Sequence, residues 1–289
     1  MNPLKLAVSS MTNYESFLSE GVPVAMKKLH ELGAVSVEIS QHIRFDQETI
    51  PEFLVAAKLY GMEICAISAQ FDGTVSSPMP VLTWEGKALK TWSLERDFDE
   101  LAALCKAFGC RYLRFAGFPG MMLTDPASVR DYMLSLENMC LRLKAHNLGL
   151  CVHNHADEFM QVEGRPLLDW AMELAPDLLM ELDVLNAQLC GVNPCDLLRQ
   201  YAGRIPLLHM QDYMVCPSGK GKEAWLKPEY RKVEVGSGNL NWPAIVRAAS
   251  ESGSAYLIVE QGSFYGKDPY TCIDKALRTL EAAAPCLAG

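Results

Sequence analysis

The sequence predicts an α/β protein of the (β/α)8 TIM barrel class, with one domain spanning residues 1–289. Two observations predict this fold. Short apolar runs alternate with longer segments of helical period along the whole chain, which is the pattern of a parallel sheet with crossover helices. The length of 289 residues also suits one such barrel, which typically takes about 250 residues.

Eight short runs are predicted strands. Each is four or five residues of largely apolar sequence, as expected for strands that are buried on both faces. In chain order they are Lys5–Ser9, Val35–Ile39, Glu63–Ile67, Tyr112–Phe115, Leu150–His153, Leu178–Leu182, Pro206–Met210 and Tyr256–Glu260.

Segments of helical period lie between these strands. They are Val22–Leu32, Ile50–Tyr60, Leu94–Phe108, Ser128–His146 and Pro243–Ser252. Glycine follows four predicted helices as an expected C-terminal stop, at Gly33, Gly61, Gly109 and Gly149. An open doubly wound sheet is the structural alternative, but it usually carries a glycine-rich phosphate loop, and neither GxGxxG nor GxxxxGK[ST] occurs here.

The composition excludes several classes of protein. With 49% hydrophobic and 21% charged residues, the chain resembles neither a disordered nor a fibrous protein. A net charge of −9 argues against nucleic acid as a partner, because binding a phosphate backbone requires a basic face. The sequence shows neither a signal-peptide pattern nor a long apolar window, so we expect a cytoplasmic protein that does not contact membranes.

Carboxylates and imidazoles gather where predicted strands end. They are Glu38, His153, His155, Asp183, His209, Asp212 and Glu260. In a barrel, the C-terminal ends of the strands carry the active site. Such groups are costly to bury together without a compensating charge, and one divalent cation is the simplest compensation. Mixed carboxylate and imidazole ligands suit manganese, cobalt, magnesium, iron or zinc.

Each of these residues also has a structural interpretation. Asp183 could cap the following helix, and His209 could be a core histidine with satisfied hydrogen bonds. Glu38 could be a solvent-exposed charge at a strand end, and the nearby Glu181 could pair with a Lys or Arg elsewhere. Several such coincidences would have to occur together, so the whole set favours a functional site.

Short motifs in a fixed order carry a family resemblance. They are Val37-Glu38-Ile39, His153-Asn154-His155 through Glu158-Phe159, Leu182-Asp183 with Asn186 and Gly191, Arg204-Ile205 before His209-x-x-Asp212, Val235-Gly236-x-Gly238 and Val259-Glu260. With these motifs the sequence resembles the xylose isomerase-like TIM barrel superfamily, in its sugar phosphate isomerase/epimerase branch. That branch includes ketose 3-epimerases, inosose dehydratase and, more distantly, endonuclease IV.

The resemblance implies a metal held by Glu, Asp, His and Glu from strands five to eight. The last three ligands correspond to Asp183, His209 and Glu260. His153 occupies the usual position of the first, while Glu158 could reach back into the site, so either could be the fourth ligand. The implied chemistry is removal of a proton beside a carbonyl, with Glu260 as the first candidate for the base and His153 or Glu158 as its catalytic partner.

The implied substrate is a small-molecule carbohydrate. Its hydroxyl groups would contact Glu38, His155, Asn186 and Asp212, with Phe71, Trp84 and Trp225 as apolar lids. An isomerase or epimerase is the first interpretation. A lyase or dehydratase acting on a keto-sugar or inosose is the alternative, because His153 replaces a glutamate, and a non-catalytic sugar-binding barrel is the remaining one.

The long segment Asp212–Gly238 follows the seventh predicted strand. It includes five basic residues, Lys220, Lys222, Lys227, Arg231 and Lys232. These residues form either a solvated loop or a segment that closes over a substrate. Because barrels of this branch often pair through loops at the barrel mouth, we expect a homodimer or homotetramer.

Overall fold

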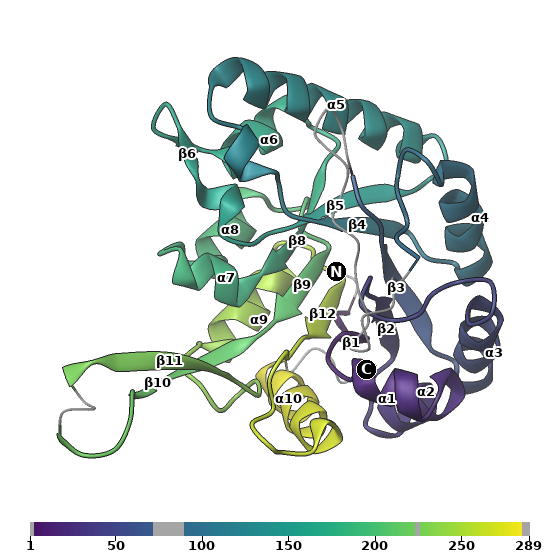
Figure 1. Cartoon of the computed structure of the whole chain (residues 1–289), viewed down its shortest axis with the longest axis vertical. Coiled ribbons are helices and arrows are strands. Elements are labelled where there is room, and N and C mark those ends of the chain that lie inside the picture. The colour runs from purple at the N-terminus through teal and green to yellow at the C-terminus, as the bar shows by residue number, and fades with distance from the viewer. Residues whose placement is uncertain (1–2, 72–89, 223–225, 285–289) are drawn as a thin grey trace.

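Eight parallel strands close into a barrel, in the order β1-β12-β9-β8-β5-β4-β3-β2 (Figure 1). The computed structural model describes residues 3–71, 90–222 and 226–284. The barrel strands are β1 (Lys5–Ser9), β2 (Ser36–Ile39), β3 (Glu63–Ser68), β4 (Tyr112–Ala116), β5 (Gly149–His153), β8 (Leu179–Asp183), β9 (Leu207–Met210) and β12 (Tyr256–Val259). The predicted fold is confirmed, and every predicted strand is found.

Helices surround the barrel on its outer side (Figure 1). They are α1 (Tyr14–Ser19), α2 (Val22–Glu31), α3 (Ile50–Tyr60), α4 (Phe98–Phe108), α5 (Pro126–Lys144), α6 (Leu167–Leu174), α7 (Val184–Leu189), α8 (Pro194–Gln200), α9 (Trp242–Glu251) and α10 (Pro269–Ala283). Short 3₁₀ turns lie at Gly120–Met122 and Asp157–Phe159. The five predicted helices correspond to α2, α3, α4, α5 and α9.

Two details of the predicted helices were wrong. Helix α4 begins at Phe98 rather than Leu94, because the backbone N–H of Leu94 donates to the carbonyl of Gln70 at 2.9 Å and ties that segment to the end of β3. Gly149 does not stop α5: it is the first residue of β5, and the left-handed residue after the helix is Asn147, with φ 60°.

The barrel is buried on both faces of its strands. A large apolar core lies between the strands and the helices and includes Val8, Leu113 and Leu182. A separate small cluster fills the barrel interior with Ala7, Cys65, Ala66, Cys151, Leu207 and Ile258, which come from five different strands. The inward positions near the C-terminal strand ends carry polar side chains instead, so the barrel has a polar mouth above an apolar floor.

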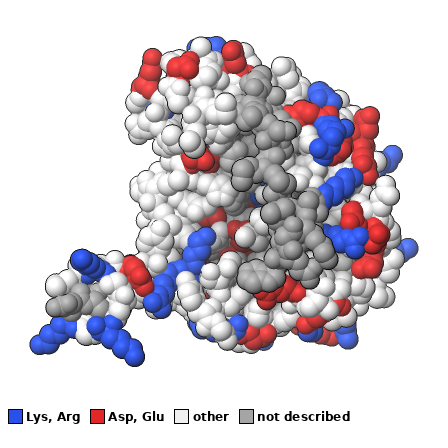
Figure 2. Space-filling view, viewed as in Figure 1, with Lys and Arg blue, Asp and Glu red and all other residues white. Residues whose placement is uncertain are grey.

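A β-hairpin projects from the barrel mouth (Figure 1). Strand β10 (Asp212–Pro217) pairs antiparallel with β11 (Pro228–Val233), from Asp212 opposite Val233 to Pro217 opposite Pro228. The segment predicted to be irregular is therefore partly a sheet. Lys and Arg side chains gather on this hairpin, whereas acidic side chains are visible near the middle of the same face (Figure 2).

A second, shorter hairpin pairs β6 (Gln161–Val162) with β7 (Arg165–Pro166).

Among the helices of the described segments, none combines the length and the apolar character needed to cross a membrane.

Candidate active site

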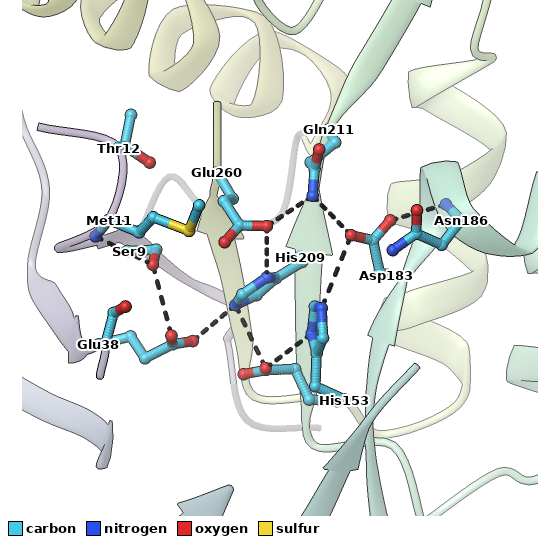
Figure 3. A network of polar contacts seen from close by, with 12 residues as sticks. Ser9, Met11, Thr12, Glu38, His153, Asp183, Asn186, His209, Gln211 and Glu260 are labelled. Atoms are coloured by element: carbon cyan, nitrogen blue, oxygen red, sulfur yellow. Dashed lines mark hydrogen bonds and ion pairs between the residues drawn. The ribbon is translucent and has the colours of Figure 1, made fainter. Parts of the chain in front are cut away.

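Four side chains from neighbouring strands meet at the barrel mouth. His153 and Asp183 are the last residues of β5 and β8, His209 lies in β9, and Glu260 follows β12. All four are buried, and one potential ligand atom from each lies within 4.8 Å of the others. Figure 3 shows them turned toward one another across the barrel. We call these residues the metal group.

Strand periodicity explains why these side chains converge. Alternate residues of a strand point to the same side, so Glu181 and Asp183 both point into the barrel while Leu182 between them packs outward. Parallel register then places Asp183 beside His209, and His153 beside Glu181. The polar groups are therefore neighbours although they lie far apart in the sequence.

Gln211 links two members of the metal group. Its Nε2 donates to Asp183 Oδ2 at 2.6 Å and to Glu260 Oε2 at 2.5 Å (Figure 3). Its Oε1 accepts a hydrogen bond from Lys232 Nζ of the projecting hairpin at 2.8 Å. Among the basic residues in the described part of this segment, Lys232 contacts the site through Gln211, whereas Lys220, Lys222, Lys227 and Arg231 are exposed.

A second group of charged side chains adjoins the metal group. Arg114, on β4, places Nη2 2.9 Å from Glu38 Oε1 and Nε 3.4 Å from Glu181 Oε2. Glu38 Oε2 lies 2.6 Å from His209 Nε2. All of these side chains are buried. Glu38 is therefore not a solvent-exposed charge, and Glu181 has the arginine partner that the sequence allowed.

The clustering changes the protonation behaviour of two groups strongly. Burial alone would lower the pKa of His209, but the carboxylates of Glu181, Glu38 and Glu260 outweigh it and raise the pKa well above its usual range. Burial, followed by repulsion from Glu260, raises the pKa of Asp183 to about 7. Four carboxylates, those of Glu38, Glu181, Asp183 and Glu260, thus lie near the charges of Arg114 and His209, and Lys232 also acts to lower the pKa of Asp183.

Glu260 and His153 respond in the opposite sense. Burial would raise the pKa of Glu260, but the neighbouring His209 outweighs this and lowers it to about 2, so the carboxylate is ionised at neutral pH. Burial, aided by His209 and Arg114, lowers the pKa of His153 well below its usual range. His153 is therefore a neutral imidazole, the form that binds metal ions.

Glu158 lies outside the metal group. It is buried, and its two oxygens accept hydrogen bonds from the backbone N–H groups of Phe118 and His155, the latter at 2.6 Å. Burial raises its pKa to about 7 despite these bonds. Of the two candidates for the fourth ligand, the geometry brings His153 to Asp183, His209 and Glu260, while Glu158 holds the backbone of the mouth.

Three residues expected to bind substrate have different surroundings. His155 is exposed at the mouth, with its ring 4.8 Å from that of His153. Asn186 is half-buried and donates from Nδ2 to the carbonyl of Asn154 at 3.1 Å. Asp212 is buried.

Asp212 holds the loop that follows the hairpin. Its Oδ2 accepts from the N–H groups of Gly236 and Gly238, each at 3.0 Å, and from Trp242 Nε1 at 2.9 Å. Its Oδ1 accepts from Tyr213 N at 2.8 Å. With both oxygens engaged, Asp212 has a structural role here, and we do not include it in the proposed site.

Some residues of the mouth were not predicted from the sequence, and some residues predicted there have other surroundings. Arg114 and Gln211 were not predicted; the signal for Arg114 was a charged residue in the middle of a buried strand. His42 is half-buried after β2, with Nδ1 2.9 Å from Ser40 Oγ. Phe71 packs against Phe115 and Tyr132. Trp84 and Trp225 lie outside the described residues.

Comparison with known proteins adds to this geometry. Residues 26–287 match the sequence profile of a family described as xylose isomerase-like TIM barrel. Inosose dehydratase of Geobacillus kaustophilus (strain HTA426) is 24% identical over 240 residues, which cover 73% of this chain and 70% of that protein. A sugar phosphate isomerase/epimerase from Parabacteroides distasonis ATCC 8503 has a TM-score of 0.75 at 17% identity, covering 98% of this chain and 99% of that one. The IOLI protein, solved with a binding zinc atom, has a TM-score of 0.64 at 14% identity, covering 97% and 98%.

Proposed function

The chain belongs to the xylose isomerase-like TIM barrel family, and we propose that it is a divalent-metal-dependent isomerase or epimerase acting on a small carbohydrate. The observation that carries the proposal is the metal group, His153, Asp183, His209 and Glu260, buried together at the barrel mouth. The reaction we propose is proton transfer at a carbon next to a carbonyl.

The chemistry of the donor set fits a divalent cation. Two imidazoles and two carboxylates are ligands that manganese, iron, cobalt and zinc accept, and two nitrogens make magnesium less suitable. The carboxylates around the site outnumber its cationic groups, so a bound dication would complete the charge balance. A cation would also favour the ionised form of Asp183, whose pKa is otherwise raised to about 7.

The residues of the site would divide the work as follows. A bound metal would polarise neighbouring substrate oxygens and acidify the adjacent C–H bond. Glu260 is ionised and would accept that proton. His155 is exposed beside the metal group and would donate a hydrogen bond to a substrate oxygen. Lys232, through its contact with Gln211, keeps a positive charge at the mouth.

A lyase is the second candidate, and one observation favours it. The metal group contains a single glutamate, because His153 stands where the family resemblance implies another. A second metal-bound glutamate to act on the opposite face of the substrate is therefore absent from the group. With one base, Glu260, and an exposed imidazole, His155, the site could remove a proton and protonate a departing hydroxyl group. The 24% identical inosose dehydratase supports this alternative.

The first experiment is metal analysis of the purified protein, followed by incubation with ketoses and inososes in deuterium oxide. About one metal per chain, with deuterium entering one sugar whose mass otherwise stays unchanged, is the expected result. Loss of water from the same substrate would instead establish the lyase. A protein that takes up no divalent metal would contradict both activities and leave the non-catalytic sugar-binding barrel.

A further inference from the structure

We propose that Glu181 is a positioning residue that holds His153 and His209 in opposite tautomers, so that each imidazole presents its free nitrogen to the metal. This inference rests on the metal site of the proposed function and deepens it. It concerns a residue outside the metal group, and it commits to a specific proton on each ring.

One oxygen of Glu181 contacts both imidazoles. Its Oε2 lies 3.0 Å from His153 Nδ1 and 3.3 Å from His209 Nε2. The two rings are themselves close, with centroids 4.6 Å apart. Glu181 is fully buried, so water does not compete for these contacts. A single carboxylate therefore faces a nitrogen of each imidazole in the metal group.

These contacts decide which nitrogen is available to a metal. A neutral imidazole carries a proton on one nitrogen and a lone pair on the other, and only the lone pair can bind a metal. A carboxylate that accepts the proton fixes the tautomer and the orientation of the ring. Glu181 faces Nδ1 of His153 at 3.0 Å and Nε2 of His209 at 3.3 Å, and at His209 it shares the acceptor role with Glu38, which lies closer at 2.6 Å.

The remaining nitrogens both face the metal group. His153 Nε2 lies 4.0 Å from Asp183 Oδ2. His209 Nδ1 lies 3.0 Å from Glu260 Oε2. His153 should therefore carry its proton on Nδ1 and bind metal through Nε2. On binding metal, the charged His209 should lose its proton from Nδ1, bind the metal through that atom and keep its proton on Nε2, which faces Glu181 and Glu38.

Arg114 supports this role because its guanidinium supplies the positive charge beside Glu38 and Glu181, where a second metal could otherwise bind. Glu38, Glu181 and His209 form a second group with potential metal-ligand spacing, but the guanidinium of Arg114 contacts both carboxylates there. Glu181 is therefore balanced by a fixed charge of the protein and remains an acceptor for the imidazoles. We therefore expect a single metal, bound by the metal group at the mouth.

The zinc-loaded protein allows a direct test, because zinc is diamagnetic. Long-range ¹H–¹⁵N correlation spectra distinguish a protonated ring nitrogen from a metal-bound one. The chain has only six histidines, and single His→Asn variants would assign their signals. We expect protonated Nδ1 in His153 and protonated Nε2 in His209. The same tautomer in both rings would overturn the inference.

Variants of Glu181 provide the second test. Glu181→Leu removes the acceptor and should weaken zinc binding by about 10–100-fold, as is typical for outer-shell partners of metal-ligating histidines. Glu181→Gln should retain most of the affinity and the tautomers, because its amide oxygen can take the place of Oε2 and its NH2 group that of Oε1, which has no hydrogen-bond partner among the described residues.

Zinc affinity is measured by competition with a chromophoric chelator, with Glu234→Gln as a matched control. Glu234 is a buried glutamate that pairs with Lys267, outside both groups, so the control should bind as the wild type does. Unchanged affinity and tautomers in Glu181→Leu would overturn the positioning role alone. A wild-type protein that binds no zinc would overturn the proposed function as well.

Discussion

The carboxylate of Asp183 accepts a hydrogen bond from the backbone N–H of Asn186 at 2.8 Å and thereby caps helix α7 through Oδ1. Its other oxygen, Oδ2, accepts from Gln211 and faces His153 within the metal group. Asp183 therefore caps the helix through Oδ1, and Oδ2 stays directed toward the proposed metal site, so the structural and the functional interpretations are compatible.

This division predicts different effects for two substitutions of Asp183. Asp183→Asn should keep the cap, because asparagine is as good an N-cap as aspartate, and should chiefly weaken metal binding. Asp183→Ala should lose both functions, with metal affinity falling by more than about 100-fold and the metal-free protein losing about 1 kcal/mol of stability. Titration with metal and urea unfolding of the metal-free variants measure the two effects separately.

The stability and the metal affinity of these variants show separately whether Asp183 caps the helix and whether it binds the metal. Equal loss of stability in the metal-free Asn and Ala variants would contradict the capping role. Wild-type metal affinity in the Ala variant would remove Asp183 from the metal group.

Removing the metal should destabilise the protein. A metal that binds only the folded state, present at about 100 times its Kd, adds about 2.7 kcal/mol to the free energy of unfolding. Calorimetry should show a lower Tm after treatment with a chelator and its return when metal is added back. Glu260→Gln should show a much smaller response, and the Glu234→Gln control the full one. An identical Tm with and without metal would count against the site.

Lowering the pH should reduce the free energy of unfolding, in part because Glu234 becomes protonated. Burial would raise the pKa of Glu234, but its bonds to Lys267 and Ser237 and to its own backbone N–H outweigh this and lower the pKa to about 2. Because the folded pKa is lower than the unfolded one, the stabilisation is present above about pH 4.5 and is lost as the pH falls toward 2. Since Lys267 is about half exposed, we expect about 1–2 kcal/mol.

The check is a series of urea unfolding curves between pH 7 and pH 2.5 for the wild type and Glu234→Gln. Glu234→Gln should be less stable at pH 7, and the difference should shrink toward zero in acid. Lys267→Met should likewise be less stable than the wild type at pH 7, with a difference that shrinks toward zero in acid. A difference that stays constant across this range would mean that the ion pair does not set the pKa of Glu234.

The loop held by Asp212 should not tolerate a side chain at Gly238. A Cβ at this position would lie 2.2 Å from the carbonyl oxygen of Tyr213 and 2.3 Å from Asp212 Oδ1. Gly238→Ala should therefore destabilise the protein by about 3 kcal/mol, among the larger effects of single substitutions. Gly262→Ala is the matched control, because its Cβ would meet no atom of the described residues within 4 Å apart from its own chain neighbours. Thermal unfolding of both variants tests the difference.

The barrel could be predicted from the sequence because each strand is a short apolar run with a simple signal. Helix ends were harder: Leu94 has helical surroundings in the sequence, yet a backbone bond to Gln70 keeps it outside α4. Short helices such as α7, which begins at its cap Asp183, span too few turns for a clear period. These elements depend on contacts between segments that the local pattern does not contain.

Asp183, His209 and Glu260 could be proposed as ligands from the sequence because each lies at or next to the C-terminal end of a buried strand, and the structure places them together with His153. The choice between His153 and Glu158 depended on side-chain direction: Glu158 lies within the 3₁₀ turn Asp157–Phe159, and its oxygens accept from backbone N–H groups. Asp212 was misplaced because its partners, the loop glycines, lie more than twenty residues later. The second-group residue Arg114 was missed because its partners Glu38 and Glu181 come from distant strands.

The proposed metal site can form only after the barrel has closed, because its residues lie on or next to strands β5, β8, β9 and β12. The seam pairs β1 with β12, and Lys5 lies beside Tyr256 across it. Because His153 ends β5 and Glu260 follows β12, a nascent chain still missing β12 holds an incomplete set of the proposed ligands. Contacts this distant in sequence form late in folding. Metal capture should therefore follow the pairing of β12 with β1, so that the cation binds a closed barrel rather than directing its assembly.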